Sequence, residues 1–134
     1  MSKLESKSGF VNILGVPNSG KATLINNLVG KKVSIVSHKV QTTRFCIRGI
    51  CTYSFKDLSK SQIILIDTPG IFAAKRRLDK AMVCAAWSEL KHSDKVIFIH
   101  DVSKSIENNS LNVMKEIFKI KEKVILVLNK IDLL

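Results

Sequence analysis

A glycine-rich segment between an apolar run and a helical pattern is the feature that most constrains how this chain can fold. The segment reads Gly15-Val16-Pro17-Asn18-Ser19-Gly20-Lys21-Ala22-Thr23 and fits the phosphate-binding pattern G-x-x-x-x-G-K-S/T except at its last position. Its glycines let backbone N–H groups turn inward around phosphate oxygens, and the helix that begins near Lys21 points its positive end at the same anion. The sequence therefore predicts a strand, a loop and a helix that together bind a nucleotide.

The last position of this pattern holds Ala22, where a serine or threonine hydroxyl would bind Mg²⁺ directly. Thr23 follows one residue later, but one helical step rotates its side chain by about 100° around the axis. We therefore do not expect Thr23 to replace the missing ligand. The substitution predicts weakened binding of Mg²⁺ and GTP, with GDP less affected.

Strand-like and helix-like patterns alternate along the rest of the chain. Short apolar runs predict buried strands, and apolar residues that recur every three or four positions predict helices. The predicted strands are Phe10–Gly15, Phe45–Tyr53, Gln62–Asp67, Val96–His100 and Val124–Asn129, and the predicted helices are 21–30, Lys75–Lys91 and Ser110–Lys121. This alternation predicts an α/β fold of the P-loop NTPase kind, with a doubly wound, mostly parallel sheet and helices on both faces.

The length of 134 residues fits one domain with a single core. The polar residues 1–8 read as a flexible lead-in, and residues 9–134 read as a partial nucleotide-binding domain. No further helix follows the last predicted strand, so we expect a sheet that is incomplete at its C-terminal edge. Two interpretations stay open: a truncated piece of a longer protein, and a short product that self-associates.

The chain is strongly basic, with a formal net charge of +11 from 22 Lys and Arg against 11 Asp and Glu. This excess favours polyanionic partners such as a nucleotide, RNA or an anionic membrane surface, although a solvated basic face is the simpler alternative. No apolar run approaches the ~18 residues of a membrane span, and the N-terminus lacks the apolar core of a secretory signal. The three cysteines fit no zinc or redox spacing, so we expect reduced thiols in the cytosol.

A second motif, Asp67-Thr68-Pro69-Gly70, ends the third predicted strand. An aspartate at the carboxyl end of a strand can hold Mg²⁺, usually through water. The N–H of Gly70 can bond a γ-phosphate, and such a contact senses hydrolysis. D-x-P-G alone is a common turn, but its place after a buried strand and downstream of a phosphate loop indicates a nucleotide switch.

A third motif, Asn129-Lys130-Ile131-Asp132, follows the last predicted strand. In the pattern N-K-x-D the aspartate carboxylate accepts hydrogen bonds from the guanine N1–H and exocyclic amine, which adenine does not offer in that arrangement. Losing such paired hydrogen bonds costs roughly 1–3 kcal/mol, enough for strong discrimination. As the third motif in order, it narrows the prediction from an NTPase to a GTPase.

The three motifs, together with the segment between the first two, resemble the GTPase domain of the bacterial Era family. Residues 15–21, the helix 23–30 and the run Ser37-His38-Lys39-Val40-Gln41-Thr42-Thr43-Arg44 carry the resemblance, which covers almost the whole chain. It implies a ribosome-assembly switch that hydrolyses GTP slowly. It also implies that the parent protein binds small-subunit ribosomal RNA and the 30S subunit, with a fifth guanine-contacting motif and a KH-type RNA-binding domain expected outside this chain.

The resemblance assigns roles to further residues. Gln-Thr-Thr-Arg is the first switch of that family, so Thr43, with Thr42 beside it, is expected to cap Mg²⁺ and the γ-phosphate. Ile71 stands where Ras-type enzymes carry a water-orienting glutamine, which implies glutamine-independent hydrolysis. Asn18 stands where cation-dependent relatives help to coordinate K⁺, although turn chemistry explains this residue equally well.

The predicted site combines these assignments. Lys21, Thr43 and Gly70 are the expected catalytic residues, and Asp67 and Thr43 the expected Mg²⁺ ligands. The expected nucleotide-binding residues are Gly15, Pro17, Asn18, Ser19, Gly20, Lys21, Ala22, Thr23, Thr42, Thr43, Asp67, Gly70, Asn129, Lys130 and Asp132. The expected cofactors are GTP or GDP with Mg²⁺, and K⁺ if Asn18 binds it.

The predicted function is a GTP-hydrolysing switch in small-subunit biogenesis, cytoplasmic, with an optional peripheral contact at the inner face of the membrane. A monomer or a weakly self-associating chain is expected. The alternative is a degenerate module that binds guanine nucleotides or a partner without hydrolysis. A sister branch of tRNA-modification or ribosome-assembly GTPases is disfavoured by the run 31–44.

Overall fold

The computed structural model describes residues 5–30, 47–68, 77–120 and 124–134. They form five strands in one sheet, three α-helices and one short 3₁₀ helix. The strands are β1 (Ser6–Gly15), β2 (Ile47–Ser54), β3 (Lys60–Asp67), β4 (Lys95–Asp101) and β5 (Val124–Asn129). The helices are α1 (Lys21–Val29), α2 (Arg77–His92), α3 (Asn108–Ile120) and the 3₁₀ turn η1 (Ile131–Leu133).

The sheet has the strand order β2-β3-β1-β4-β5. β1 lies at its centre and pairs in parallel with β3 and β4, and β5 extends the parallel part beyond β4. β2 is antiparallel to β3, because a tight turn through Leu58, which has a φ of 66°, joins the two as a hairpin. The predicted α/β fold with a mostly parallel sheet is confirmed.

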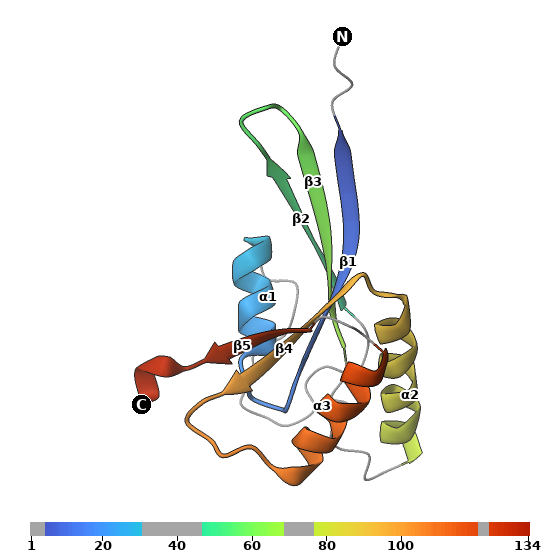
Figure 1. The fold of residues 1–134 in the computed structure, drawn as a ribbon, viewed down its shortest axis with the longest axis vertical. Helices are drawn as coiled ribbons and strands as arrows, with labels where there is room; N and C mark the ends of the chain where they lie inside the picture. The colour runs from blue at the N-terminus through green and yellow to red at the C-terminus, as the bar shows by residue number, and fades with distance from the viewer. Residues whose placement is uncertain (1–4, 31–46, 69–76, 121–123) are drawn as a thin grey trace.

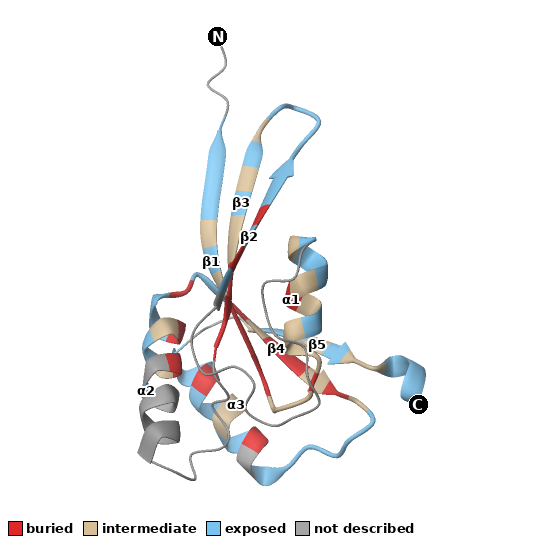
Figure 2. Ribbon diagram, turned by 180° about the vertical axis from the view of Figure 1, so that it is seen from behind, coloured by how far each residue is buried: buried red, intermediate tan, exposed pale blue. Residues whose placement is uncertain are grey.

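The helices cover both faces of the sheet, as Figure 1 shows with α1 on one side and α2 and α3 on the other. Under α1 the core contains Ile13, Ile25, Cys51, Leu65 and Ile99, and on the opposite face it contains Leu14, Ala86, Leu90, Val96, Phe98 and Ile117. In Figure 2 the buried stretches of the strands lie between α1 on one side and α2 and α3 on the other. Alternate residues of one strand therefore serve two cores, as expected for a strand that is covered on both faces.

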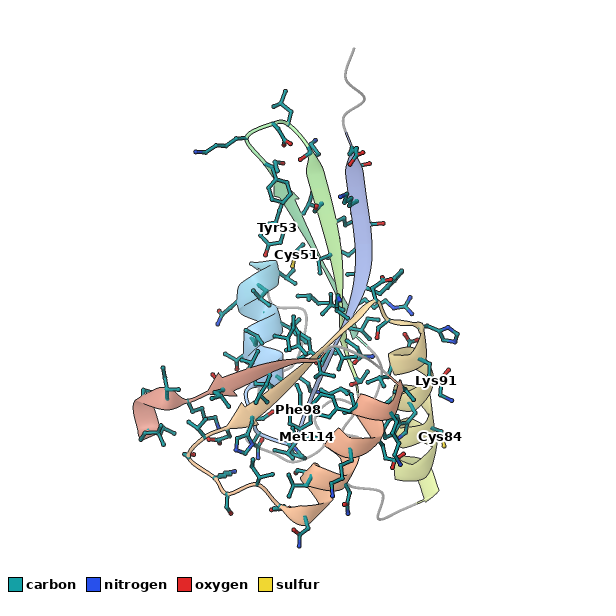
Figure 3. All side chains as sticks on the ribbon, viewed as in Figure 1. Cys51, Tyr53, Cys84, Lys91, Phe98 and Met114 are labelled. Carbon is teal, nitrogen blue, oxygen red and sulfur yellow. The ribbon has the colours of Figure 1, made fainter. Side chains whose placement is uncertain are left out.

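Individual side chains illustrate the two cores in Figure 3. Phe98 of β4 faces α3, where Met114 packs against the same cluster. On the other face the thiol of Cys51 is buried and lies 3.3 Å from the carbonyl oxygen of Leu28 at the end of α1. Burial raises the pKa of the Cys51 thiol above its ordinary value, so the group stays protonated and packs as a small apolar residue.

The N-terminal end of β1 differs from the prediction. Residues 1–8 were predicted to be a flexible lead-in, but β1 begins at Ser6 and its first residues pair with Lys60 to Gln62 of β3. The side chains of this part of the strand are exposed on both faces, so the sequence has no apolar alternation to reveal it. Backbone pairing alone forms the strand here, and Figure 1 shows it projecting past the helices beside the β2–β3 hairpin.

The opposite side of the sheet ends at β5, whose apolar side chains are about half exposed: Ile125 52 %, Leu126 52 % and Leu128 57 %. Within the described residues β5 pairs only with β4 and is the outer strand of the sheet on this side. No helix among the described residues has the length and apolar character needed to cross a membrane.

Ile25 tests the core beneath α1. Its side chain is fully buried between α1 and the sheet, so Ile25→Ala should lower the free energy of unfolding by about 2–5 kcal/mol. Urea unfolding of the nucleotide-free chain measures this loss. Leu28→Ala on the same helix is the matched control and should cost clearly less, because Leu28 is 41 % exposed. Equal losses would contradict this arrangement of α1.

Candidate guanine-nucleotide site

The three sequence motifs come together at one edge of the sheet. Because β1, β3, β4 and β5 run in parallel, their carboxyl ends lie at the same edge, which is where open α/β sheets bind ligands. The loop after β1 carries the first motif, the end of β3 carries Asp67 and Thr68, and the end of β5 carries Asn129 and Lys130. Motifs far apart in the sequence thus form one site.

The phosphate loop has the backbone of an anion cradle. Asn18 and Gly20 adopt left-handed conformations with φ of 64° and 96°, and Gly20 is the N-cap of α1. No side chain caps this helix and no acidic residue lies in its first turn, so its first N–H groups and its positive end are available to an anion. Gly15 is needed for close packing, because a Cβ there would lie 2.5 Å from the Ile99 Cγ2 and 2.8 Å from its carbonyl oxygen.

Lys21 reaches from this loop to the second motif. Its Nζ lies 2.7 Å from Asp67 Oδ1 and also donates to the carbonyl oxygen of Thr68. Asp67 is fully buried, and among the described residues neither of its carboxylate oxygens has a partner that meets hydrogen-bond geometry, so the ion pair with Lys21 is its main compensation. A buried carboxylate with free lone pairs is suited to a cation or its water ligands.

The predicted Mg²⁺ donors fit the ion only in part. Asp67 offers the orphaned oxygen that such a site needs. Ala22 lies in the first turn of α1 and offers none, and Thr23 beside it is exposed. Thr43 lies outside the described residues, as do Thr42 and Gly70, so their predicted roles stay predictions.

The base-recognition motif is bonded directly to the phosphate loop. Asn129 Nδ2 donates to the carbonyl oxygen of Ser19 at 2.9 Å, and Lys130 Nζ donates to that of Asn18 at 2.7 Å. Gly20 makes this contact sterically possible, because a Cβ at Gly20 would collide with Asn129 Nδ2. The two loops are therefore tied together by side-chain hydrogen bonds.

Of the remaining predicted nucleotide-binding residues, Pro17 and Ser19 lie on the phosphate loop and Asp132 lies in η1. Pro17 is half-buried on the phosphate loop, and the backbone of Ser19 turns back through an N–H bond to Val16 O at 3.2 Å. Asp132 lies exposed in η1, just past Lys130, which has a left-handed φ of 62°. This exposed carboxylate, two residues after Lys130, can accept hydrogen bonds from a base.

One residue of the site was missed by the sequence analysis. Asp101 ends β4, is 2 % exposed, and lies with its Oδ2 2.7 Å from Lys130 Nζ. Its Oδ1 accepts from the N–H of Ser103 at 3.0 Å and from the Ser103 hydroxyl at 2.5 Å. Its position in the sequence could have revealed it, because Asp101 follows a buried apolar run in the same way that Asp67 does.

A mainly parallel sheet whose phosphate loop, strand-end aspartate and N-K-x-D motif meet at one edge is the arrangement of a P-loop GTPase domain. Comparison with known protein families supports this classification. The model of the family described as 50S ribosome-binding GTPase matches residues 10–130, and the chain therefore belongs to this family.

Within the family, the similar proteins confirm the resemblance to Era. The chain is 48 % identical over 128 residues to a protein named GTPase Era from Brucella suis, covering 96 % of this chain and 40 % of the relative. It is 43 % identical over 149 residues to GTPase Era from Maricaulis maris, covering 100 % of this chain and 46 % of the relative. The chain thus spans less than half the length of these curated relatives.

Solved structures show the same likeness. A variant of Aquifex aeolicus Era bound to GDP and AlF₄⁻ has a TM-score of 0.84 at 38 % identity, covering 94 % of this chain and 42 % of that one. An Era structure in complex with MgGDPNP and nucleotides 1506–1542 of 16S ribosomal RNA has a TM-score of 0.80 at 39 % identity, covering 96 % and 42 %.

Asp101 makes the free energy of unfolding depend on pH under acidic conditions. The hydrogen bonds from Lys130 and then Ser103 lower the pKa of its carboxyl from 3.8 to about 2. Since the pKa is lower in the folded state, the ionised group stabilises the fold above about pH 5, and this contribution is lost as the pH falls toward 2. The difference in free energy of unfolding between this chain and Asp101→Asn should shrink between about pH 4 and about pH 2.

Urea unfolding at a series of pH values measures this difference. Asp101→Asn has no titrating carboxyl, so its own pH dependence supplies the baseline. A difference that stays constant down to about pH 2 would show that the ionised carboxylate is not its source.

Proposed function

We propose that this chain binds guanine nucleotides and that its parent protein uses GTP hydrolysis as a slow switch in the assembly of the small ribosomal subunit. The observation that carries the proposal is the pair of hydrogen bonds from Asn129 and Lys130 to the phosphate loop. They hold a guanine-selecting motif beside an anion cradle. Membership of a GTPase family supports the same function.

Binding would rearrange the charges already present. The N–H groups of the phosphate loop and the start of α1 would receive the phosphates, and Lys21 would exchange its contact with Asp67 for the terminal phosphates. Asp67 would then be free to hold Mg²⁺, which when bound neutralises charge on the phosphates. Asp132 would accept from the guanine edge, and the alkyl chain of Lys130 would lie along the base.

Hydrolysis would be the attack of a water molecule on the γ-phosphate. Lys21 and the loop N–H groups would stabilise the developing negative charge. We propose Thr43 and Gly70 as the residues that sense the γ-phosphate, from their positions in the motifs. We propose that Asn18 helps to hold K⁺ through its side chain, where the left-handed backbone already turns the loop toward the phosphates.

The wider role concerns the parent protein. One Era structure contains a fragment of 16S ribosomal RNA, and this chain covers 42 % of the protein in that structure. We propose that the parent protein binds small-subunit ribosomal RNA through a KH-type domain outside this chain, in the cytoplasm, with a peripheral contact to the inner face of the membrane. The net charge of +11 supports a polyanionic partner.

A titration with fluorescent GDP and GTP, with and without Mg²⁺, tests nucleotide binding. We expect both to bind this chain, with Mg²⁺ adding little to GTP affinity because Ala22 provides no ligand oxygen. In Ala22→Ser, Mg²⁺ should tighten GTP binding by about tenfold or more, the equivalent of roughly 1.4 kcal/mol. An equal response to Mg²⁺ in both proteins would contradict the assignment of Ala22.

Two substitutions of similar shape at position 22 control for the effect of added side-chain volume on GTP binding. Ala22→Thr and Ala22→Val add nearly the same volume, but only the threonine adds a hydroxyl. Mg²⁺ should tighten GTP binding in Ala22→Thr and not in Ala22→Val. ADP, which lacks the guanine edge, should compete poorly in all of these proteins, and tight ADP binding would contradict the role of Asp132.

The alternative function, a module that binds without hydrolysis, is favoured by Ala22. Phosphate release from GTP in the presence of Mg²⁺ and either K⁺ or Na⁺ separates the two. Slow turnover that K⁺ stimulates supports the switch and the role of Asn18. If the chain binds nucleotides without hydrolysing GTP, and if Ala22→Ser restores hydrolysis, the chain is a degenerate member of the family.

A further inference from the structure

The carboxyl end of β4 contributes a charge to the site that none of the three motifs contains. Asp101 is 2 % exposed, and its partner Lys130 has a side chain that is 31 % exposed. Lys130 Nζ lies 2.7 Å from Asp101 Oδ2 and 2.7 Å from the carbonyl oxygen of Asn18. One ammonium group therefore joins the end of β4, the end of β5 and the phosphate loop.

We infer that Asp101 is a positioning residue, which holds Lys130 against the phosphate loop so that the base-reading loop and the phosphate loop bind one nucleotide as a unit. The inference rests on the proposed function, since it concerns how that site is organised. Among the described residues, the Asp101 carboxylate is bonded to Lys130 and to Ser103, so its effect on a nucleotide would pass through Lys130.

The physical reason lies in the flexibility of lysine. Its four-carbon stem has many rotamers, so ordering this side chain has an entropic cost. The ammonium group of Lys130 donates to the neutral Asn18 carbonyl and to the Asp101 carboxylate, but only the carboxylate adds an opposite charge, and its burial reduces the screening of that attraction by solvent. Asp101 thus decides whether Lys130 stays in place before a nucleotide arrives.

Asp101 is itself held rigidly. Its Oδ1 takes two hydrogen bonds from Ser103, and the N–H of Lys104 bonds to its backbone carbonyl at 3.1 Å. The N–H of Val102 also bonds to the carbonyl oxygen of Asn129 at 3.1 Å, so the backbones of the two loops are tied together. The carboxylate therefore presents its second oxygen to Lys130 from a fixed place.

The chain contains a matched control in the β2–β3 hairpin. There Asp57 Oδ1 accepts from the N–H of Ser59 at 3.0 Å and from the Ser59 hydroxyl at 2.6 Å, the same pair of aspartate–serine hydrogen bonds as at Asp101. Asp57 is exposed and has no lysine bonded to it among the described residues. Comparing substitutions of the two aspartates therefore separates the effect of changing the hydrogen bonds to the serine from the effect of losing the contact with Lys130.

The test is a double-mutant cycle with Asp101→Asn, Lys130→Met and the double variant, read out as the affinity for fluorescent GDP. Asp101→Asn should weaken binding by about tenfold, as expected for losing one charge-assisted contact. In the Lys130→Met background the same change should alter affinity by less than about twofold, because there is no ammonium left to position. Asp57→Asn should bind GDP as the unmodified chain does.

A second measurement needs no nucleotide. In the free protein, Asp101→Asn should shift the backbone amide NMR signals of Ser19 and Gly20, since it frees the lysine bonded next to them. Asp57→Asn should leave those signals in place. Unshifted signals in Asp101→Asn would overturn the inference whether or not the chain binds GDP.

The two proposals fail in different ways. If the unmodified chain binds no guanine nucleotide, the proposed function is wrong and the amide signals alone decide the role of Asp101. If the chain binds GDP but Asp101→Asn binds equally well, or loses the same factor in the Lys130→Met background, the positioning role is wrong and the proposed function stands.

Discussion

The parallel pairing of β1 with β3 and β4 is the constraint on which the rest of this structure depends. It sets the carboxyl ends of the strands side by side and turns each following loop toward the same edge. The pairing requires the loop after β1 to pass very close to β4, and Gly15 allows this because Ile99 occupies the space of any larger side chain. The site follows from backbone geometry first and from side chains second.

Charge is the second determinant of the site. Asp67 and Asp101 are both buried, at the ends of the two strands that flank β1, and each is faced by a lysine from a different loop. Two buried carboxylates without such partners would be strongly unfavourable. The pairs are not equivalent, however. Asp67 keeps oxygen lone pairs without hydrogen-bond partners, whereas Asp101 is satisfied by Ser103 as well as by Lys130.

Much of this arrangement could be predicted from the sequence, because the motifs carry their own geometry. The sequence showed that a strand ends at Gly15, that a helix begins near Lys21, and that Asp67 and Asn129 each end a strand. The strand that ends at Asn129 was predicted to be buried, but its described side chains are half-buried or exposed. It did not show the start of β1, since Ser6 to Ser8 pair through their backbone without any apolar pattern. It also missed Asp101, because the partner that gives this aspartate a role, Lys130, is brought near only by the pairing of β4 with β5.

The contact between Gly20 and Asn129 has a consequence for the order of folding. The phosphate loop follows β1, but the donors to its Ser19 and Asn18 carbonyl oxygens come from the end of β5, which is synthesised after the other four strands of the described sheet. A nascent chain that has reached only the end of β4 can form the central ladder, yet its loop still lacks both of these tethers. Since such non-local contacts form late and at an entropic cost, the anion cradle is completed only when β5 docks.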